Sequence, residues 1–349
     1  MKNLVRMMSV LVLVAALGIV VTTAQEEDVD RSDWPSVFSF GRFAGDDSAE
    51  ALNGAEPLRA YLEAELGIPV TVNVGSTYTA VIAAMAAGQV DAFEVGPFAF
   101  VIAEREAGAE AIAVGASESS LEDGATATFD PTIRPFYYSV FVTVKGNGIQ
   151  TLQDLEGVDF AFVDPASTSG RNAPVVRLIN EIDGLETPGD VDEWVNPIFA
   201  GSHPSAMLAL INGDVVAGVT YEGNLINQRS EGLAEVCGFE DDQTGITLTP
   251  EDLQAIYDDC PDGSLVVIAQ SDPIPNTPFA IRSDLPESFK DAVQEVLLSI
   301  QDEPEVLAEI GRWYVNPALD EELSAELGLT ELYDFYDVVR DIAAVTTDQ

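Results

Sequence analysis

Short aliphatic runs alternate with helix-like segments along most of this chain, and this alternation constrains the fold more than any other feature. Residues 68–74 and 90–95 are strand-like, and residues 78–87 between them have the composition of a helix that ends at Gly88. Two strands joined by a crossover helix lie parallel in one sheet, with helices on its faces. We therefore expect an α/β protein. Further strand-like runs occur at residues 37–41, 140–144, 158–163, 194–199, 215–221, 265–269 and 279–282.

A short internal repeat divides this pattern into two halves. Parts of residues 76–92 match parts of residues 201–217 at an offset of 125. Each copy contains a strand, a capping hydroxyl residue, one large polar ring and a helix that stops at glycine. Ligands of open parallel sheets bind at the carboxyl ends of the strands, where these helices begin. We expect two similar lobes, with Tyr78 and His203 facing each other across a shared cleft.

A third predicted helix start is richer in hydroxyl groups. A strand-like run that ends at Val163 leads into Ser167, Thr168, Ser169 and Gly170, and a helix follows. Free backbone N–H groups and the positive end of the helix dipole favour anions there, and three hydroxyls add donors. An ordinary helix start needs only one capping Ser or Thr. The pattern therefore indicates either anion binding or simple capping.

The charge balance limits what the chain can bind. Its 349 residues include 60 Asp and Glu against 15 Lys and Arg, for a formal net charge of −45. Nucleic acids and anionic membranes attract basic surfaces, so we expect neither as a partner. The acids are dispersed and form no D-x-[DN]-x-[DN]-G loop, so we expect no bound metal and no cofactor. Such dispersed charge is typical of a solvated surface adapted to high salt.

Residues 1–24 have the pattern of an export signal rather than of a folded segment. Lys2 and Arg6 precede an uncharged, mainly aliphatic stretch at residues 10–21, and small residues at 22–24 offer a cleavage site. The stretch is short for a transmembrane span. We expect export to the periplasm or a similar extracytoplasmic space, with an uncleaved membrane anchor as the alternative.

Two cysteines, Cys237 and Cys260, lie within the acidic residues 231–264. In an exported chain an even number of cysteines permits a disulfide, and this pair lacks the spacing of a zinc site. We expect the two to pair and to staple this segment at the surface, away from the ligand site.

Several strings in the chain resemble those of the phosphate/phosphite/phosphonate substrate-binding proteins of ABC transporters. The most specific is D-P-A-S-T-S-G at residues 164–170, and A-G-Q-V-D at residues 87–91 and F-A-G-S-H at residues 199–203 also match. The resemblance covers residues 37–300. It implies a two-lobed periplasmic-binding-protein fold, similar to type II, in which each lobe is a mostly parallel sheet flanked by helices and the ligand binds between the lobes. It also implies delivery of a small phosphorus oxyanion to membrane permease subunits, and we expect a monomer.

The resemblance also implies which residues hold the ligand. The phosphorus-bound oxygens would be held by Tyr78, Ser167, Thr168, Ser169 and His203. Tyr221 and Glu222 would lie near the rest of the ligand.

Two departures from the family pattern concern the far end of the ligand. Glu94 stands where relatives often have Trp, and Thr277 stands where many have Asp. In this family, carboxylates beyond the phosphorus group can pair with a ligand's ammonium, and an unpaired ammonium in a closed cleft is costly. We therefore expect phosphate, phosphite or methylphosphonate to bind better than 2-aminoethylphosphonate.

The repeat and the resemblance together suggest domain boundaries. Lobe one is expected to contain residues 37–138 and 272–300, and lobe two residues 139–271. Residues 231–264 read as an insertion in lobe two. We expect the helices of residues 301–349 to pack on lobe one.

An enzyme is the competing class of function. Asp164, Ser167 and His203 are residue types found in nucleophilic catalysis, but the chain has neither a G-x-S-x-G elbow nor a G-x-x-x-x-G-K-[ST] loop. Fixed donors without a base or a metal bind a tetrahedral anion without turning it over, so we expect a protein that is not an enzyme and has no catalytic residues. A binder of sulfonates or carboxylates remains the alternative, followed by a phosphorus-ester hydrolase.

Overall fold

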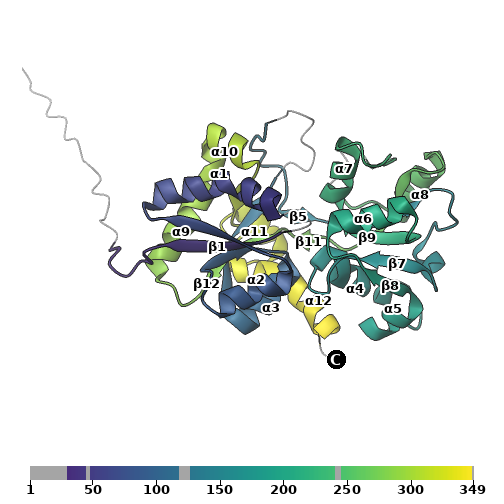
Figure 1. Ribbon diagram of the computed structural model, residues 1–349, viewed down its shortest axis with the longest axis horizontal. Helices are drawn as coiled ribbons and strands as arrows, with labels where there is room; N and C mark the ends of the chain where they lie inside the picture. Colours follow the sequence, from purple (N-terminus) through teal and green to yellow (C-terminus); the bar gives the residue numbers. More distant parts are fainter. Residues whose placement is uncertain (1–29, 45–47, 118–125, 240–244, 348–349) are drawn as a thin grey trace, which may run out of the picture.

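The computed structural model describes residues 30–44, 48–117, 126–239 and 245–347 and shows two sheets side by side, each flanked by helices (Figure 1). The expected export signal, residues 1–24, lies outside the described residues. Within the described part of the chain, no helix combines the length and the apolar character needed to cross a bilayer.

The first sheet is mixed, with more antiparallel than parallel pairings, and is thus less parallel than expected. Its six strands follow the order β13 (Trp313–Val315), β4 (Ala109–Ala116), β12 (Pro278–Arg282), β3 (Ala92–Glu94), β1 (Phe38–Phe43) and β2 (Val70–Gly75). β1 is parallel to both β2 and β3, whereas β12 is antiparallel to β3 and β4. β1 to β4 therefore run in one direction, and their carboxyl ends share one edge. We call this sheet with its helices lobe one.

Helices cover both faces of the first sheet. One face is covered by α1 (Ser48–Leu66), α9 (Glu287–Ser299) and α10 (Pro304–Ile310), and the other by α2 (Tyr78–Ala86) and α3 (Pro97–Ala107). In α9 the buried residues Phe289, Val293 and Leu297 recur every four positions, which places them on one stripe toward the sheet. Phe289 packs edge-on against Phe38 of β1.

The second sheet repeats the same arrangement with five strands. They follow the order β10 (Leu265–Gln270), β6 (Ser139–Val144), β9 (Ala217–Tyr221), β7 (Asp159–Phe162) and β8 (Asn196–Phe199). β7 is parallel to β8 and β9, and β6 is antiparallel to β9 and β10. The flanking helices are α4 (Ala173–Glu181), α5 (Pro188–Trp194), α6 (His203–Asn212), α7 (Glu222–Ser230) and α8 (Pro250–Asp259). We call this unit lobe two.

The chain passes between the lobes at a small ladder. β5 (Phe136–Tyr137) pairs antiparallel with β11 (Ile274–Pro275), just before β6 in one direction and just before β12 in the other. The final segment contains α11 (Glu321–Leu327) and α12 (Asp337–Thr347). α12 packs on α3 of lobe one and also on α4 of lobe two.

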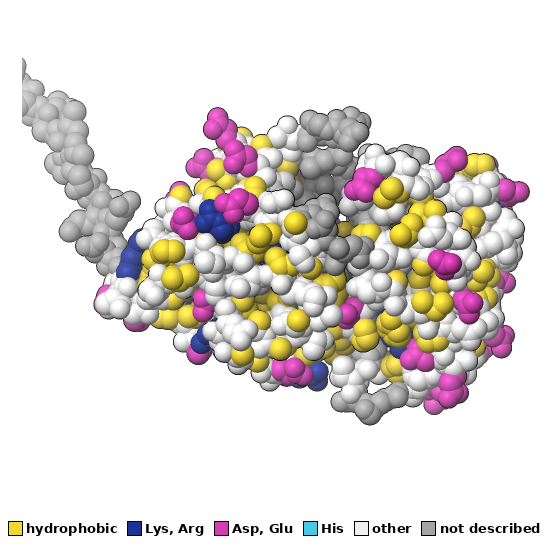
Figure 2. All heavy atoms as spheres, in the orientation of Figure 1, with side chains coloured by type: hydrophobic (Ala, Val, Ile, Leu, Met, Phe, Trp, Pro, Cys, Tyr) yellow, Lys and Arg dark blue, Asp and Glu magenta, His cyan; other side chains and the backbone are white. Residues whose placement is uncertain are grey.

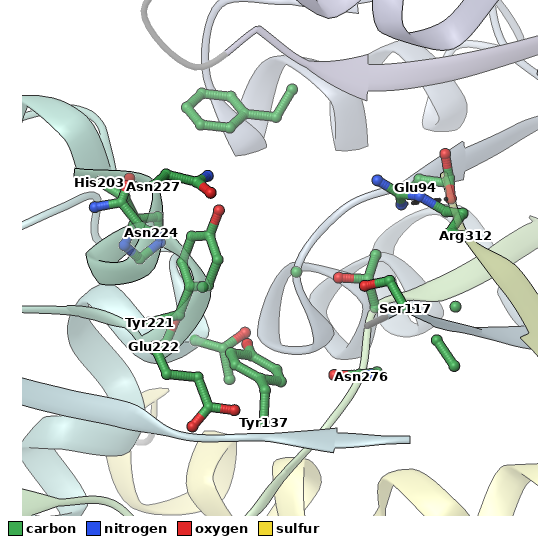
Figure 3. Close-up of a pocket in the computed structure, with 18 of the residues that line it drawn as sticks. Glu94, Ser117, Tyr137, His203, Tyr221, Glu222, Asn224, Asn227, Asn276 and Arg312 are labelled. Carbon is green, nitrogen blue, oxygen red and sulfur yellow. Dashed lines mark hydrogen bonds and ion pairs between the residues drawn. The ribbon is translucent and has the colours of Figure 1, made fainter. Parts of the chain in front are cut away.

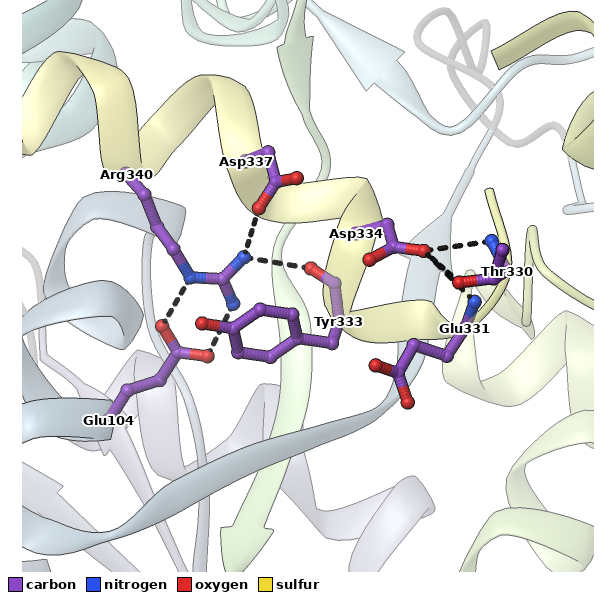
Figure 4. A network of polar contacts seen from close by, with 7 residues as sticks. All are labelled: Glu104, Thr330, Glu331, Tyr333, Asp334, Asp337 and Arg340. Atoms are coloured by element: carbon purple, nitrogen blue, oxygen red, sulfur yellow. Dashed lines mark hydrogen bonds and ion pairs between the residues drawn. The ribbon is translucent and has the colours of Figure 1, made fainter. Parts of the chain in front are cut away.

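A polar network fixes α12 against lobe one (Figure 4). Both sides of the Arg340 guanidinium donate to the carboxylate of Glu104 in α3, at 3.0 Å and 2.5 Å. Arg340 also donates to Asp337 and to the carbonyl of Tyr333, whose ring lies 3.5 Å from the guanidinium carbon. A bidentate, partly buried pair of this kind is among the stronger ion pairs in proteins.

The acidic residues are scattered over the surface. On the face shown in Figure 2, Asp and Glu side chains are spread over both lobes, and few Lys or Arg side chains lie among them. The described residues contain no cluster of three or more His, Cys, Asp or Glu side chains arranged to hold a metal ion.

Candidate functional site

A cavity of about 1270 Å³ lies between the two lobes, and residues from both lobes line it (Figure 3). It lies at the edge where the parallel strands end and the following helices begin, as the sheet topology predicts. All seven residues singled out from the sequence line this cavity: Tyr78, Ser167, Thr168, Ser169, His203, Tyr221 and Glu222.

The run of hydroxyl residues forms a tight, buried turn between β7 and α4. Ser167 precedes η2 (Thr168–Asn172), a single π-helical turn, and its Oγ accepts a hydrogen bond of 3.0 Å from the backbone N–H of Gly170. A Cβ at Gly170 would lie 2.3 Å from that of Val163, so only glycine fits. Ser167, Thr168 and Ser169 are each at most 3% exposed. One hydroxyl therefore serves as the cap, and two more line the cavity beside it.

Thr168 connects this turn to lobe one. Its Oγ1 accepts a hydrogen bond of 2.8 Å from the backbone N–H of Phe98, in the first turn of α3. That helix starts at Gly96, which has no capping side chain. Two helix N-termini, one from each lobe, thus meet at Thr168, and both favour negative charge.

Two tyrosines of the cavity wall remain protonated donors. Burial raises the pKa of Tyr78 well above its usual value, although a hydrogen bond to Ser167 acts in the opposite direction. Burial also raises the pKa of Tyr137 to about 12, opposed by hydrogen bonds to Ser169 and Thr168. Sequence analysis did not single out Tyr137, because it lies in the short strand β5, where no motif marks it.

His203 begins α6, and a hydroxyl cap precedes it as the repeat predicts. Ser202 Oγ accepts from the backbone of α6 at 3.1 Å, and Thr77 Oγ1 accepts from that of α2 at 3.0 Å. The Nδ1 atom of His203 lies 3.1 Å from Thr220 Oγ1. Burial lowers the pKa of His203 to about 3, so the ring is neutral near pH 7. Nε2 has no hydrogen-bond partner among the described residues, and His203 lines the cavity.

Glu222 lies beside Tyr221 but is more deeply buried. Its Oε1 accepts a hydrogen bond of 2.9 Å from the backbone N–H of Gly245, and Oε2 is buried without a partner among the described residues. Burial raises the pKa of Glu222 to about 8, so the carboxyl is mainly protonated near neutral pH. In this state Glu222 is a poor partner for an ammonium group.

The segment of residues 231–264 reaches the cavity, which corrects one expectation. Cys237 and Cys260 do form a disulfide. However, Gly245 and Ile246 line the cavity, so the segment is not remote from the site. The backbone of Gly245 also holds Glu222, a contact between a loop and a strand end that no sequence motif indicates.

The far wall of the cavity, in lobe one, contains two arginines that sequence analysis did not identify. Glu94 accepts from Tyr314 at 2.5 Å and from Arg312 at 3.3 Å through Oε1, while Oε2 lies 3.5 Å from Arg42 Nε. Burial raises the pKa of Glu94, but Arg312 and Arg42 outweigh this effect and hold it below the usual value. Arg42 stands at the end of β1, a position that topology marks. Arg312 lies much later in the sequence than the other residues of this wall, and no motif around it indicates that it belongs to the site.

Comparison with known proteins identifies the family. A model described as "ABC transporter, phosphonate, periplasmic substrate-binding protein" matches residues 40–323, which include most of both lobes and all seven predicted site residues. The chain belongs to this family. The resemblance based on residues 164–170 is thereby confirmed.

Among the relatives of this phosphonate-binding family is the phosphate-import protein PhnD of Mycolicibacterium smegmatis. It is 34% identical over 193 residues, which cover 54% of this chain and 56% of the relative. The aligned part thus spans little more than half the length of that relative.

Solved structures confirm the two-lobed α/β fold. The structure of PhnD1 from Prochlorococcus marinus in complex with methylphosphonate aligns over 89% of this chain and 98% of its own, with a TM-score of 0.63 and 16% identity. A binding protein component of an ABC phosphonate transporter from Pseudomonas aeruginosa aligns over 88% and 96%, with a TM-score of 0.57 and 20% identity.

Proposed function

We propose that this protein captures a small phosphorus oxyanion in the cavity between its lobes and delivers it to the permease of an ABC importer. The ligand class is phosphate, phosphite or a phosphonate, and the protein acts outside the cytoplasm as a monomer. Residues 1–24 direct export, and the lobes formed by residues 37–138 with 272–300 and by residues 139–271 close on the ligand.

The observation that carries this proposal is the convergence of uncharged donors at one end of the cavity. Three consecutive buried hydroxyls, a neutral His203 and the Tyr78 hydroxyl surround a space to which two helix N-termini also contribute. Hydroxyl, imidazole and backbone N–H groups can together donate to several oxygens of one tetrahedral anion.

The energies of such donors are sufficient for a transport receptor. A hydrogen bond to a charged group contributes about 1.5–3 kcal/mol net, so five donors contribute roughly 8–15 kcal/mol before the costs of association. Micromolar binding needs about 8 kcal/mol, so the site requires no cationic clamp around the phosphorus group.

The names of the relatives support the same ligand class. The mycobacterial relative is named for phosphate import, and the Prochlorococcus structure contains methylphosphonate. The family is one of transport proteins, which agrees with a binding role.

The competing enzyme class finds little support in the geometry. Asp164 Oδ1 accepts from the backbone N–H of Ala166, so this oxygen stabilises the turn. No hydrogen bond joins Asp164 to His203 among the described contacts, and the Nδ1 side of the ring faces Thr220 instead. We infer that the site binds its ligand unchanged.

Calorimetry with phosphate, phosphite, methylphosphonate and methanesulfonate tests the proposal. We expect at least one phosphorus anion to bind at micromolar or lower Kd and at least tenfold more tightly than methanesulfonate. Tighter binding of the sulfonate would favour the alternative ligand class. Release of nitrophenolate from p-nitrophenyl phosphate would contradict the transport role.

A further inference from the structure

The far wall of the cavity carries more positive than negative charge. Arg42 and Arg312 converge on a single carboxylate, that of Glu94, so these three side chains together carry one net positive charge. The chain as a whole has a formal net charge of −45, with only 15 Lys and Arg. Three of these few cations line the ligand cavity, and two of them, Arg42 and Arg312, share this one carboxylate.

Glu94 uses only a small part of the hydrogen-bonding capacity of the two arginines. Each guanidinium has five N–H donors in a planar fork. Arg312 donates to Glu94 through one Nη atom, and Arg42 approaches Glu94 only through Nε at 3.5 Å. Arg42 has no other side-chain partner among the described residues, Arg312 has a further hydrogen bond with Tyr314, and both arginines line the cavity. Their remaining donors are therefore available on the cavity side.

A third arginine of the cavity, Arg134, differs from Arg42 and Arg312. It forms an exposed ion pair with Glu326 of α11 at the rim of the cavity. The side chains of Arg42 and Arg312 are 19% and 35% exposed, while Glu94 is 3% exposed. The carboxylate is thus more buried than the two guanidinium groups and is already paired with both, so it is a poor partner for a ligand's ammonium.

The two ends of the cavity belong to one continuous space. Figure 3 shows Arg312 and Glu94 on one side and His203 and Tyr221 on the other. The charge of Arg312 also acts on Tyr221, where it partly offsets the rise in pKa caused by burial. A volume of about 1270 Å³ corresponds to roughly 40 water molecules, far more than one phosphonate head group fills.

Building on the proposed function, we propose that the cavity accepts phosphonates with a second anionic group, namely a carboxylate on a short alkyl chain. The phosphonate lies at the hydroxyl turn, and the carboxylate lies between Arg42 and Arg312. The planar fork of arginine suits a carboxylate, and a partly buried site strengthens the attraction. The second group thus supplies the acceptors that these guanidinium groups lack.

The wild-type protein alone tests the inference. Calorimetry compares phosphonoacetate, 3-phosphonopropionate and 4-phosphonobutyrate, each with its uncharged amide, and also 2-aminoethylphosphonate and methylphosphonate. We expect at least one acid to bind fivefold or more tightly than its amide, and 2-aminoethylphosphonate to bind more weakly than that amide. If no acid gains fivefold while methylphosphonate or phosphate binds, the second site is wrong and the proposed function stands. If no phosphorus anion binds, the proposed function itself fails.

Variants locate the effect. In Arg312→Met we expect the acid-to-amide affinity ratio to fall at least threefold, and Arg42→Met to act in the same direction. Arg177→Met is the matched control, because Arg177 pairs with Glu181 on α4, outside the cavity. An unchanged ratio in folded Arg312→Met would overturn the assignment. If that variant does not fold, the wild-type acid and amide series decides.

Discussion

The hydroxyl oxygen of Thr168 in lobe two accepts a hydrogen bond of 2.8 Å from the backbone N–H of Phe98 in lobe one. A hydroxyl group carries one proton, so an oxygen that accepts here still has its proton to donate. Thr168 lines the cavity, so it can donate this proton to a ligand in the cavity or to another residue of the cavity wall. One side chain therefore serves both the contact between the lobes and the proposed ligand contact.

Thr168→Val should weaken binding of methylphosphonate by about 10- to 100-fold, since it removes one hydrogen bond to a charged group and leaves the Phe98 N–H unpaired. Thr168→Ser keeps the hydroxyl and should stay within about fivefold of wild type. Calorimetry of the three proteins at one pH and salt concentration provides the test. Equal affinities of the valine variant and wild type would show that Thr168 does not hold the ligand.

His203→Ala should weaken the same binding by about 10- to 100-fold, because Nε2 is a proposed donor to the anion. Burial holds the pKa of His203 at about 3, so its charge does not change between pH 5 and 7. The pH dependence of affinity over this range should therefore be the same in wild type and in His203→Gln. A gain in affinity toward pH 5 in wild type alone would mean that the ring binds as a cation.

Glu222 should make folding stability depend on pH. Burial raises its pKa from 4.5 to about 8 in the folded protein. Below pH 4.5 both states are protonated. As the pH rises to 8, the unfolded chain ionises first, so the free energy of unfolding falls by a few kcal/mol, about 1.4 kcal/mol per unit of pKa shift.

Glu222→Gln removes this titration and keeps an oxygen for the Gly245 N–H. The stability of wild type minus that of the variant, measured by urea unfolding, should decline between pH 5 and pH 8. Glu193→Gln, at an exposed position of α5, controls for the loss of one acid. A flat difference would contradict the burial of an ionisable Glu222.

The disulfide should stabilise the fold and the cavity together. Cys237 and Cys260 are 23 residues apart, so in the chain-entropy model replacing both with Ser costs about 3 kcal/mol. Because Gly245 and Ile246 lie within the closed loop and line the cavity, we also expect weaker binding of methylphosphonate. Guanidinium unfolding and calorimetry of the double serine variant measure both effects. Unchanged stability would show that the loop is held by its other contacts.

The sequence contained enough information for the fold and for one end of the cavity. Alternation of strands and helices predicts the sheets, and the hydroxyl caps before Tyr78 and His203 predict which helix starts meet. These signals are local, because capping and periodicity act over a few residues. Sequence analysis did not identify Arg312 and Gly245, because only the tertiary fold brings them to the cavity. Arg312 follows α10 near the end of the chain, and Gly245 lies in a loop after α7.

The position of α12 has a consequence for how the cleft opens. This helix is packed on α3 and on α4, one from each lobe, and none of its residues lines the cavity. If the two lobes moved apart along their whole length, α12 would lose its contact with one of them, and apolar side chains would become exposed. We expect the two lobes instead to rotate about an axis beside α12. The cleft then stays closed on the side of α12 and opens on the opposite side. Solute then enters only from the side opposite α12. A transporter that recognises the closed form can distinguish it by contacting that side alone.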